Sequence, residues 1–309
     1  MSGVLAGLIG SLAGKFGITW TIRTAASTND WGSIAWNGTL FAAVAGSGTG
    51  DRVMTSPDGI TWTSRTSAAD NGWTDIAWNG TLFVALSITG TNNRVMTSPD
   101  GITWTTRTSA ADNDWRGVAW NGTVWAAVAS SGANRVMTSP DGITWTSRTA
   151  AAAIGWWAIA WNGTVFVAVA REIGTTNRVM TSPDGITWTT RTTPDNQWNS
   201  IAWNGTVFVA VADSGSADRV MTSPDGITWT SRTTNNNQWT SVAWNGTVFA
   251  AVSRTGTNNR VMTSPDGITW TTRTSAANNA WSGIAWNGTV FAAVANAAAG
   301  TDMVMTCGD

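Results

Sequence analysis

The chain repeats one pattern seven times, and each copy spells Gly-Ile-Thr-Trp, then Trp-Asn-Gly-Thr, then Val-Met-Thr. The copies begin at Gly17, Gly59, Gly101, Gly142, Gly185, Gly226 and Gly267. Successive copies are therefore 41 to 43 residues apart, a period typical of propeller blades. The final residues, 304–309, match the end of a copy, so Asp309 would run directly into Gly17. A whole number of units whose two ends complete one another indicates a closed ring.

Each unit predicts four short β-strands, which we name A to D. In the second copy they are Trp73 to Trp78, Thr81 to Leu86, Arg94 to Ser98 and Ile102 to Thr108. Asn79-Gly80 lies between strands A and B and predicts a tight type I′ hairpin, in which both central residues have positive φ. Pro99-Asp100-Gly101 predicts a second tight turn between strands C and D. Two such hairpins per unit predict an antiparallel four-stranded blade.

The sequence thus predicts an all-β protein, a seven-bladed β-propeller of four-stranded antiparallel blades over residues 17–309. We expect strand A to be innermost and the Arg-bearing strand D to form the outer edge. One N-terminal strand (1+3) is expected to close the ring in the last blade. The predicted blades are 31–66, 73–108, 115–149, 156–192, 198–233, 239–274, and 281–307 plus 17–24.

The C–D turn carries a resemblance to a known family. The segment Ser98-Pro99-Asp100-Gly101-Ile102-Thr103-Trp104 resembles the Asp-box (BNR) hairpin of sialidase-like and related β-propellers, shortened by one residue between Asp and Gly. At the seam, Cys307 and Gly308 replace Ser and Pro. The resemblance implies a structural turn in which Asp accepts N–H groups and Trp packs beneath, and it implies no activity by itself.

Composition excludes several function classes. The chain has no His, which excludes His-based triads, His acid–base chemistry and His metal sites. It has no Tyr and a single Glu, whereas a sialidase site needs a Tyr nucleophile helped by Glu. A net charge of -1 offers no basic footprint for nucleic acid. We expect no enzyme, no cofactor and no metal, although a two-carboxylate glycosidase built from Asp75, Asp112 and Asp114 stays open.

The two faces of the predicted disc differ in variability. The A–B and C–D turns barely change between copies, whereas the B–C and D–A loops change in length and charge. The unusual residues of the variable face are Arg116, Trp157, Arg171, Glu172 and Arg254. Two explanations of this contrast stay open: relaxed constraint in the loops, and divergence of the loops for recognition. We treat the variable face as the candidate ligand-binding face.

Tryptophan occurs at three repeated positions in each unit. Two of these, represented by Trp78 and Trp104, predict packing between blades. The third lies at the start of strand A beside the variable loops, where either packing or a stacking platform for sugar rings is expected. Its members are Trp31, Trp73, Trp115, Trp156, Trp198, Trp239 and Trp281.

Residues 1–16 form an apolar leader, which we expect to anchor the protein. Its apolar residues are Val4, Leu5, Leu8, Ile9 and Leu12. The run is too short to span a bilayer and lacks the basic start of a secretory signal, so no transmembrane segment is expected. The Gly/Ala/Thr/Asn-rich composition and this leader resemble bacteriophage tail-fibre or head-decoration proteins.

These observations lead to one functional expectation with two alternatives. We expect a non-enzymatic virion component (fibre, spike or decoration protein) that attaches to another virion or assembly subunit through residues 1–16. Its variable face would then recognise a host surface or a cell-surface glycan. The alternatives are a free soluble lectin, secreted or cytosolic without a classical signal peptide, and a glycoside hydrolase.

Overall fold

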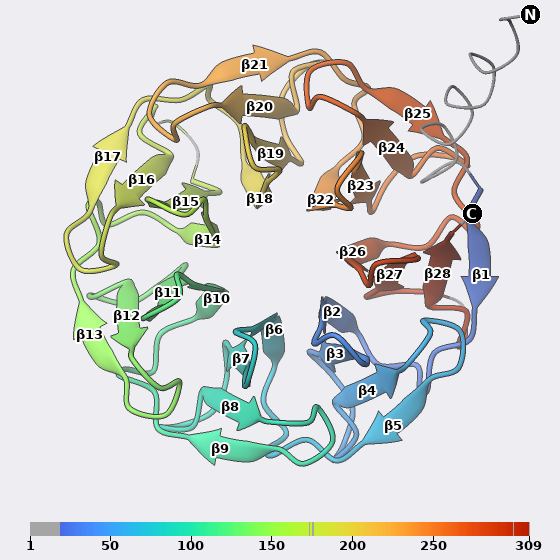
Figure 1. The fold of residues 1–309 in the computed structure, drawn as a ribbon, viewed down its shortest axis with the longest axis horizontal. Coiled ribbons are helices and arrows are strands. Elements are labelled where there is room, and N and C mark those ends of the chain that lie inside the picture. Colours follow the sequence, from blue (N-terminus) through green and yellow to red (C-terminus); the bar gives the residue numbers. More distant parts are fainter. Residues whose placement is uncertain (1–18, 173, 175, 299, 309) are drawn as a thin grey trace, which may run out of the picture.

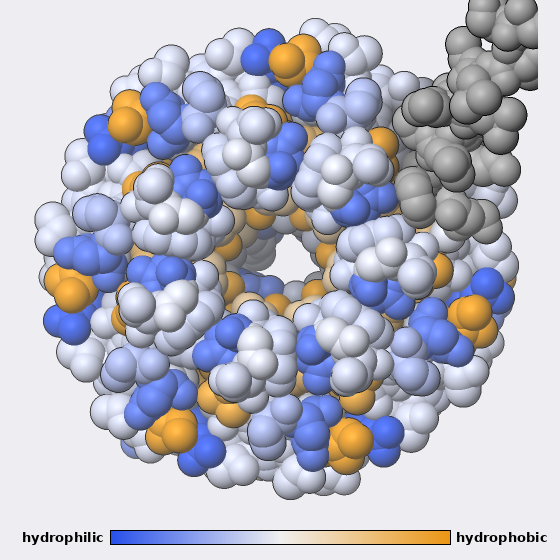
Figure 2. All heavy atoms as spheres, viewed as in Figure 1, coloured by the Kyte–Doolittle hydropathy of each residue, from blue (hydrophilic) through white to orange (hydrophobic). Residues whose placement is uncertain are grey.

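The computed structural model describes residues 19–172, 174, 176–298 and 300–308. It is a ring of seven four-stranded antiparallel sheets (Figure 1), as the repeat predicts, and the space-filling view shows a central channel as an opening at the middle of the ring (Figure 2). In six sheets the four strands follow one another in chain order from the channel outward, beginning with β2-β3-β4-β5. Within the described part of the chain, no helix has the length and apolar character needed to cross a bilayer.

The strands repeat with nearly constant bounds. The innermost strands (A) are β2 (Trp31–Trp36), β6 (Trp73–Trp78), β10 (Trp115–Trp120), β14 (Trp156–Trp161), β18 (Trp198–Trp203), β22 (Trp239–Trp244) and β26 (Trp281–Trp286). Strands B are β3 (Phe41–Ala45), β7 (Phe83–Ser87), β11 (Trp125–Ala129), β15 (Phe166–Ala170), β19 (Phe208–Ala212), β23 (Phe249–Ser253) and β27 (Phe291–Ala295).

The outer half of each blade is shorter. Strands C are β4 (Val53–Ser56), β8 (Val95–Ser98), β12 (Val136–Ser139), β16 (Val179–Ser182), β20 (Val220–Ser223), β24 (Val261–Ser264) and β28 (Val304–Cys307). Strands D are β5 (Thr63–Arg65), β9 (Thr105–Arg107), β13 (Thr146–Arg148), β17 (Thr189–Arg191), β21 (Thr230–Arg232), β25 (Thr271–Arg273) and the N-terminal β1 (Thr21–Arg23).

The ring is closed by the N-terminal strand. β1 pairs antiparallel with β28, with Thr21 opposite Thr306 and Arg23 opposite Val304, so the last sheet has the order β1-β28-β27-β26. The Arg23 side chain adds a 3.0 Å hydrogen bond from Nε to Thr306 Oγ1. Main-chain pairing between the two ends of the chain therefore fastens the circle, as the repeat phase predicts.

The A–B turn differs from the predicted type I′ hairpin. Trp78 pairs with Phe83, so four residues connect the strands, and within them only Gly80 has positive φ (102°). Asn79 Oδ1 accepts the N–H groups of Thr81 (2.9 Å) and Leu82 (2.7 Å). The Asn side chain thus replaces a main-chain turn acceptor, and strand B begins two residues later than predicted.

The C–D turn shortens strand D. Asp100 Oδ1 accepts the N–H groups of Ile102 and Thr103, both at 2.8 Å, and Trp104 Nε1 donates to Gly101 O at 3.0 Å. These bonds draw 102–104 into the turn, so β9 contains three residues where seven were predicted. The exposed isoleucines of these turns recur around the rim of the face shown in Figure 2, which is open at its centre.

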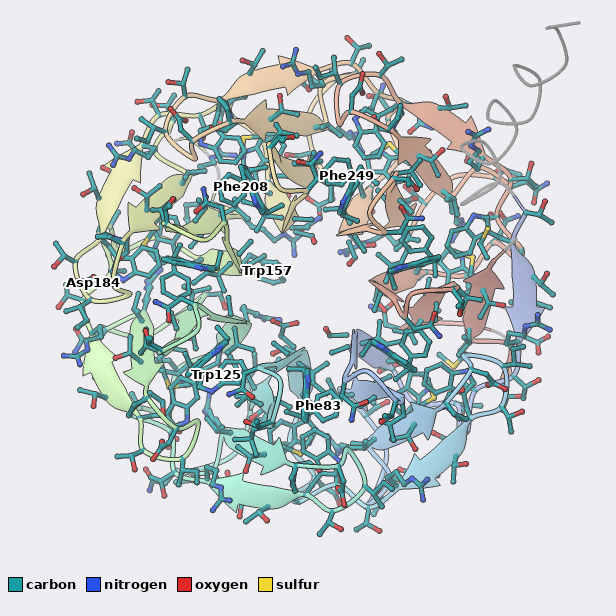
Figure 3. All side chains as sticks on the ribbon, in the orientation of Figure 1. Phe83, Trp125, Trp157, Asp184, Phe208 and Phe249 are labelled. Atoms are coloured by element: carbon teal, nitrogen blue, oxygen red, sulfur yellow. The ribbon has the colours of Figure 1, made fainter. Side chains whose placement is uncertain are left out.

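Strands B form the centre of each blade's core. All five residues of β7 are fully buried. The ring of Phe83 lies 4.6 Å from that of Trp78 and 6.1 Å from that of Trp104. In the third blade Trp125 takes the place of this Phe (Figure 3). The second-blade rings pack in one cluster with Ala42, Val44 and Val53 of the preceding blade, so flat aromatic groups fill the space between neighbouring twisted sheets.

Candidate binding site at the channel mouth

A β-bulge in each inner strand places one residue at the mouth of the channel. Trp73 pairs with Ser87 and Asp75 pairs with Leu86, so Thr74 is an extra residue in β6. A bulge redirects the side chain of its extra residue. The same register shift occurs in all seven blades. The resulting bulge positions are Gly32, Thr74, Arg116, Trp157, Asn199, Thr240 and Ser282.

In four blades the bulge residue fastens its blade to the next. Thr74 Oγ1 donates a hydrogen bond of 2.7 Å to Trp115 O, the carbonyl at the start of the neighbouring inner strand. We call this contact the interblade latch. Equivalent latches are made by Asn199 to Trp239 O, Thr240 to Trp281 O and Ser282 to Trp31 O. The other three bulge positions hold Gly32, Arg116 and Trp157, which make no latch.

Arg116 and Trp157, which make no latch, form a cation–π stack together with Arg171. Trp157 extends from β14 toward the centre of the ring (Figure 3). The guanidinium carbon of Arg116 lies 4.1 Å from the Trp157 ring centroid, and that of Arg171 lies 4.4 Å from it. Both distances are well within the range of a cation–π interaction. Three of the side chains predicted for the variable face, Arg116, Trp157 and Arg171, therefore meet at the channel mouth.

A buried carboxylate joins this stack to the next blades. Arg171, Asp213 and Arg254 each follow the last residue of strand B in three successive blades. Arg171 Nη2 bonds to Asp213 Oδ2, and Arg254 Nη2 lies 3.9 Å from the same oxygen. The Asp213 side chain is only 6% exposed. One carboxylate thus serves two guanidinium groups.

The arginine pKa values reflect this crowding. Burial lowers the pKa of Arg116; Asp114 opposes the shift and Arg171 adds to it. Burial likewise lowers the pKa of Arg171, against the attraction of Asp213 and together with the repulsion of Arg254. Like charges held close together outside bulk water disfavour their own ionised forms.

A cavity of about 240 Å³ opens at this mouth. It is lined by Asp30, Gly32, Gly46, Trp73, Thr74, Arg116, Trp157, Asn199, Thr240, Arg254, Ser282 and Asn296. A second cavity, of about 130 Å³, lies deeper and shares seven of these residues. The upper cavity is slightly smaller than the roughly 300–1,000 Å³ of sites for drug-sized ligands. It has the size for one small ligand or for the end group of a larger one.

Asp75 is the carboxylate of the deeper cavity. Its Oδ2 accepts the Val118 N–H at 2.9 Å and its Oδ1 accepts the Ser33 hydroxyl at 2.8 Å, so it links three blades. Burial raises the pKa of Asp75 to about 6, although both hydrogen bonds oppose the shift. Asp112 and Asp114, in contrast, both pair with Arg94. The three carboxylates considered for a glycosidase are therefore held in different settings.

The proposed platform of strand-A tryptophans is wrong. All seven side chains are 0% or 1% exposed, so their ring faces are covered by the core. Trp73 illustrates the cause, since its Nε1 donates to Ala69 O at 3.1 Å and fastens the D–A loop over the ring. The buried set is Trp31, Trp73, Trp115, Trp156, Trp198, Trp239 and Trp281.

The remaining candidates lie elsewhere. Glu172 is exposed, and its Oε2 accepts the Gly155 N–H at 3.2 Å without lining either cavity. The anchor residues Val4, Leu5, Leu8, Ile9 and Leu12 fall outside the described residues. Among residues 19–172, 174, 176–298 and 300–308, no group of three or more His, Cys, Asp or Glu is placed to hold a metal ion.

Sequence reasoning missed Asp30 and Asp213 as mouth residues. The signal for Asp213 was available in the repeat, because Arg171, Asp213 and Arg254 each lie 15 residues after the first tryptophan of their blades, Trp156, Trp198 and Trp239. The bulge carries no comparable signal. It depends on how the strand pairs with its neighbour, and no single residue type occupies the extra position in the seven blades.

Comparison with known proteins shows likeness at the level of fold. No family model matches the chain, and no curated protein matches it. Virginiamycin B lyase from Staphylococcus aureus is similar in structure, with a TM-score of 0.78 at 12% identity, covering 96% of this chain and 100% of the lyase. The catalytically inactive histidine-to-alanine variant of that lyase with quinupristin gives a TM-score of 0.76 at 11% identity, covering 94% and 100%.

A different protein is similar to a lesser degree. YCF48 from Cyanidioschyzon merolae gives a TM-score of 0.66 at 15% identity, and the match covers 94% of this chain and 98% of that one. At such identities the likeness establishes a β-propeller fold alone, since one fold hosts many unrelated activities.

Proposed function

We propose that this protein is a non-enzymatic recognition propeller whose ligand binds at the channel mouth, against the side chains of blades 3 to 6. The observation that carries the proposal is the replacement of the interblade latch by Arg116 and Trp157. We infer a host-surface or glycan group as the ligand because the loops of the variable face diverge between copies whereas the turns of the opposite face do not.

The loss of latches has an energetic meaning. A hydrogen bond within a protein makes a net contribution of about 0.5–1.5 kcal/mol to the free energy of unfolding. Blades 3 and 4 lack the equivalent of the 2.7 Å hydrogen bond that Thr74 makes to the next blade. Their bulge positions instead carry large side chains that line an open cavity. When a scaffold departs from its own local rule, the departure commonly marks a functional site.

Binding without turnover is supported by the chemistry present. The chain has no histidine, whereas the structurally similar lyase is catalytically inactive in a histidine-to-alanine variant. Asp112 and Asp114 both form ion pairs with Arg94. Neither of them is therefore free to act as the second carboxylate of a glycosidase beside Asp75. The mouth offers cations, amide and hydroxyl groups for holding a ligand. These groups suit recognition.

The attachment part of the proposal rests on the sequence of residues 1–16. An apolar leader on a propeller with an exposed, variable face fits a virion fibre, spike or decoration protein. A protein lacking residues 1–15 should fold and bind ligand but fail to join its parent assembly, measured by co-sedimentation with that assembly. Normal incorporation would contradict the anchor, whereas a full-length protein that joins no assembly would favour a free soluble lectin.

A glycan screen with latch-restoring variants tests the binding site. Arg116→Thr and Trp157→Thr remove the mouth side chains while supplying the hydroxyl that Thr74 uses elsewhere. We expect both to stay folded and to lose glycan binding, measured on an array and by calorimetry. Ile102→Thr, on the opposite face, is the control and should bind normally. Unchanged binding by both mouth variants would contradict this site.

A further inference from the structure

Several polar atoms at the channel mouth are buried without a hydrogen-bond partner. Arg254 Nε and Asn199 Oδ1 belong to residues that line the upper cavity. Arg171 Nε and Asp213 Oδ1, in the same cluster, are also unpartnered. Leaving such a group unsatisfied is unfavourable, and buried polar groups in native proteins are usually paired. The cluster holds unused donors on its arginines and unused acceptors on Asn199 and Asp213.

The charges of the cluster do not balance. Arg171 and Arg254 share a single buried carboxylate, Asp213, and Arg116 stacks on the same Trp157 ring as Arg171. Asp114 attracts Arg116 but is itself bonded to Arg94 at 3.1 Å. The carboxylate that lines the upper cavity, Asp30, comes from blade 1, which lies across the ring from β14 and β18 (Figure 1). This sector of the mouth therefore carries excess positive charge.

We propose that the ligand bound at the mouth is a hydroxylated molecule bearing an oxyanion, with the oxyanion against Arg254 and Arg116 and a hydroxyl donating to Asn199 Oδ1. This inference rests on the proposed function and names its ligand class. Guanidinium groups bind carboxylate, sulfate and phosphate oxygens through paired N–H donors. An acidic sugar residue combines such a group with hydroxyls and is small enough to enter as an end group.

Trp157 then acts as a positioning residue. Its ring lies within 4.4 Å of two guanidinium carbons, so it holds Arg116 and Arg171 in place through cation–π contacts. The arginines occupy the ring, and we assign Trp157 no stacking contact with a sugar. Trp157→Phe keeps a cation–π ring and should retain the preference for acidic ligands, whereas Trp157→Thr should lose it.

The test compares matched probes on the full-length protein by isothermal titration calorimetry. The probes are glucose, glucuronic acid, glucose 6-sulfate, glucose 6-phosphate, inorganic sulfate and inorganic phosphate. We expect at least one acidic sugar to bind about tenfold or more tightly than glucose, with an affinity that falls as salt rises. Arg254→Gln should weaken that binding about tenfold or more, while Arg107→Gln on the outer edge should not.

Asn199→Thr separates the two halves of the proposal. Threonine preserves the latch, as Thr240 does, but removes the unpartnered Oδ1. We expect weaker binding of the acidic sugar and unchanged binding of the inorganic ion. Equal affinity for the acidic sugar and the bare ion would overturn the hydroxyl contact. Equal affinity for glucose and the acidic sugars would overturn the oxyanion and leave the proposed function standing. If no probe binds and mouth variants leave the glycan screen unchanged, both fail.

Discussion

Installing a latch where the chain lacks one should stabilise the propeller, and Gly32 is the position for it. A Cβ added there would lie 3.4 Å from Trp73 O and 3.8 Å from Val44 O, in ordinary contact with its neighbours. These are the carbonyls equivalent to Trp115 O and Leu86 O, to which Thr74 Oγ1 donates. A serine hydroxyl at position 32 therefore finds its acceptor already in place.

The expected gain has two parts. The new hydrogen bond contributes about 0.5–1.5 kcal/mol. Replacing glycine in a compatible backbone adds about 0.4–1 kcal/mol by restricting the unfolded chain. Gly32→Ser should thus raise the free energy of unfolding by roughly 1–2.5 kcal/mol, and Gly32→Ala by the second part alone. At roughly 2 °C per kcal/mol for a chain of this size, the Tm of the serine variant rises by about 2–5 °C.

Calorimetric melting and urea denaturation of the parent, Gly32→Ala and Gly32→Ser proteins measure the two parts separately. The difference between serine and alanine isolates the latch. The converse change, Thr74→Val, should lower stability by about 1–3 kcal/mol because it leaves Trp115 O without its donor, while Thr74→Ser should be nearly neutral. If serine and alanine at position 32 behave alike, the latch contributes nothing and the argument from its loss at Arg116 and Trp157 collapses.

Three other perturbations test the packing and titration of the ring. Gly117→Ala should cost about 1–3 kcal/mol in thermal unfolding, because the added Cβ would lie 2.9 Å from Ala158 Cα; an unchanged Tm would show that the blades can separate. Trp73→Ala should destabilise the fold by about 3–5 kcal/mol, and a variant of parental stability that loses ligand would return this ring to the binding face. Burial raises the pKa of Asp75 from 3.8 to about 6, so between these pH values the folded protein binds more protons at this residue than the unfolded protein does. The contribution of Asp75 to the free energy of unfolding therefore falls as pH rises from about 4 to 6. Asp75→Asn should flatten that part of the pH profile of the urea midpoint, and a profile identical to the parent's would contradict the assignment.

The repeat made the fold predictable to a degree unusual for a single sequence. The phase of the copies located the seam, and the structure closes there through Thr21 to Arg23 on β28. Strand A was bounded correctly in the second blade, because its two tryptophans mark both ends. The predicted type I′ conformation of the A–B turn was wrong, because the Asn79 side chain accepts two main-chain N–H groups and Asn79 does not have a positive φ. Local side-chain bonding of that kind competes with the backbone turn that Asn-Gly suggests.

The site was predictable in part. The unusual residues Arg116, Trp157, Arg171 and Arg254 stood out against six other copies of their own repeat, and the structure brings them together. Glu172 stood out in the same way and lies apart. Departure from a repeat shows that a position is special, and it does not show which neighbour that position faces.

The sequence alone determined the number of blades, their strand order and the point at which the ring closes, because these follow from a period and from complementary ends. Only the tertiary structure decided what each position does. The bulge that turns Thr74 toward the next blade depends on pairing with the neighbouring strand. The same bulge turns Trp157 toward the channel, and it is invisible in the residues themselves. Burial of Trp73 and exposure of the mouth around Arg254 are likewise consequences of how seven wedges meet around one axis.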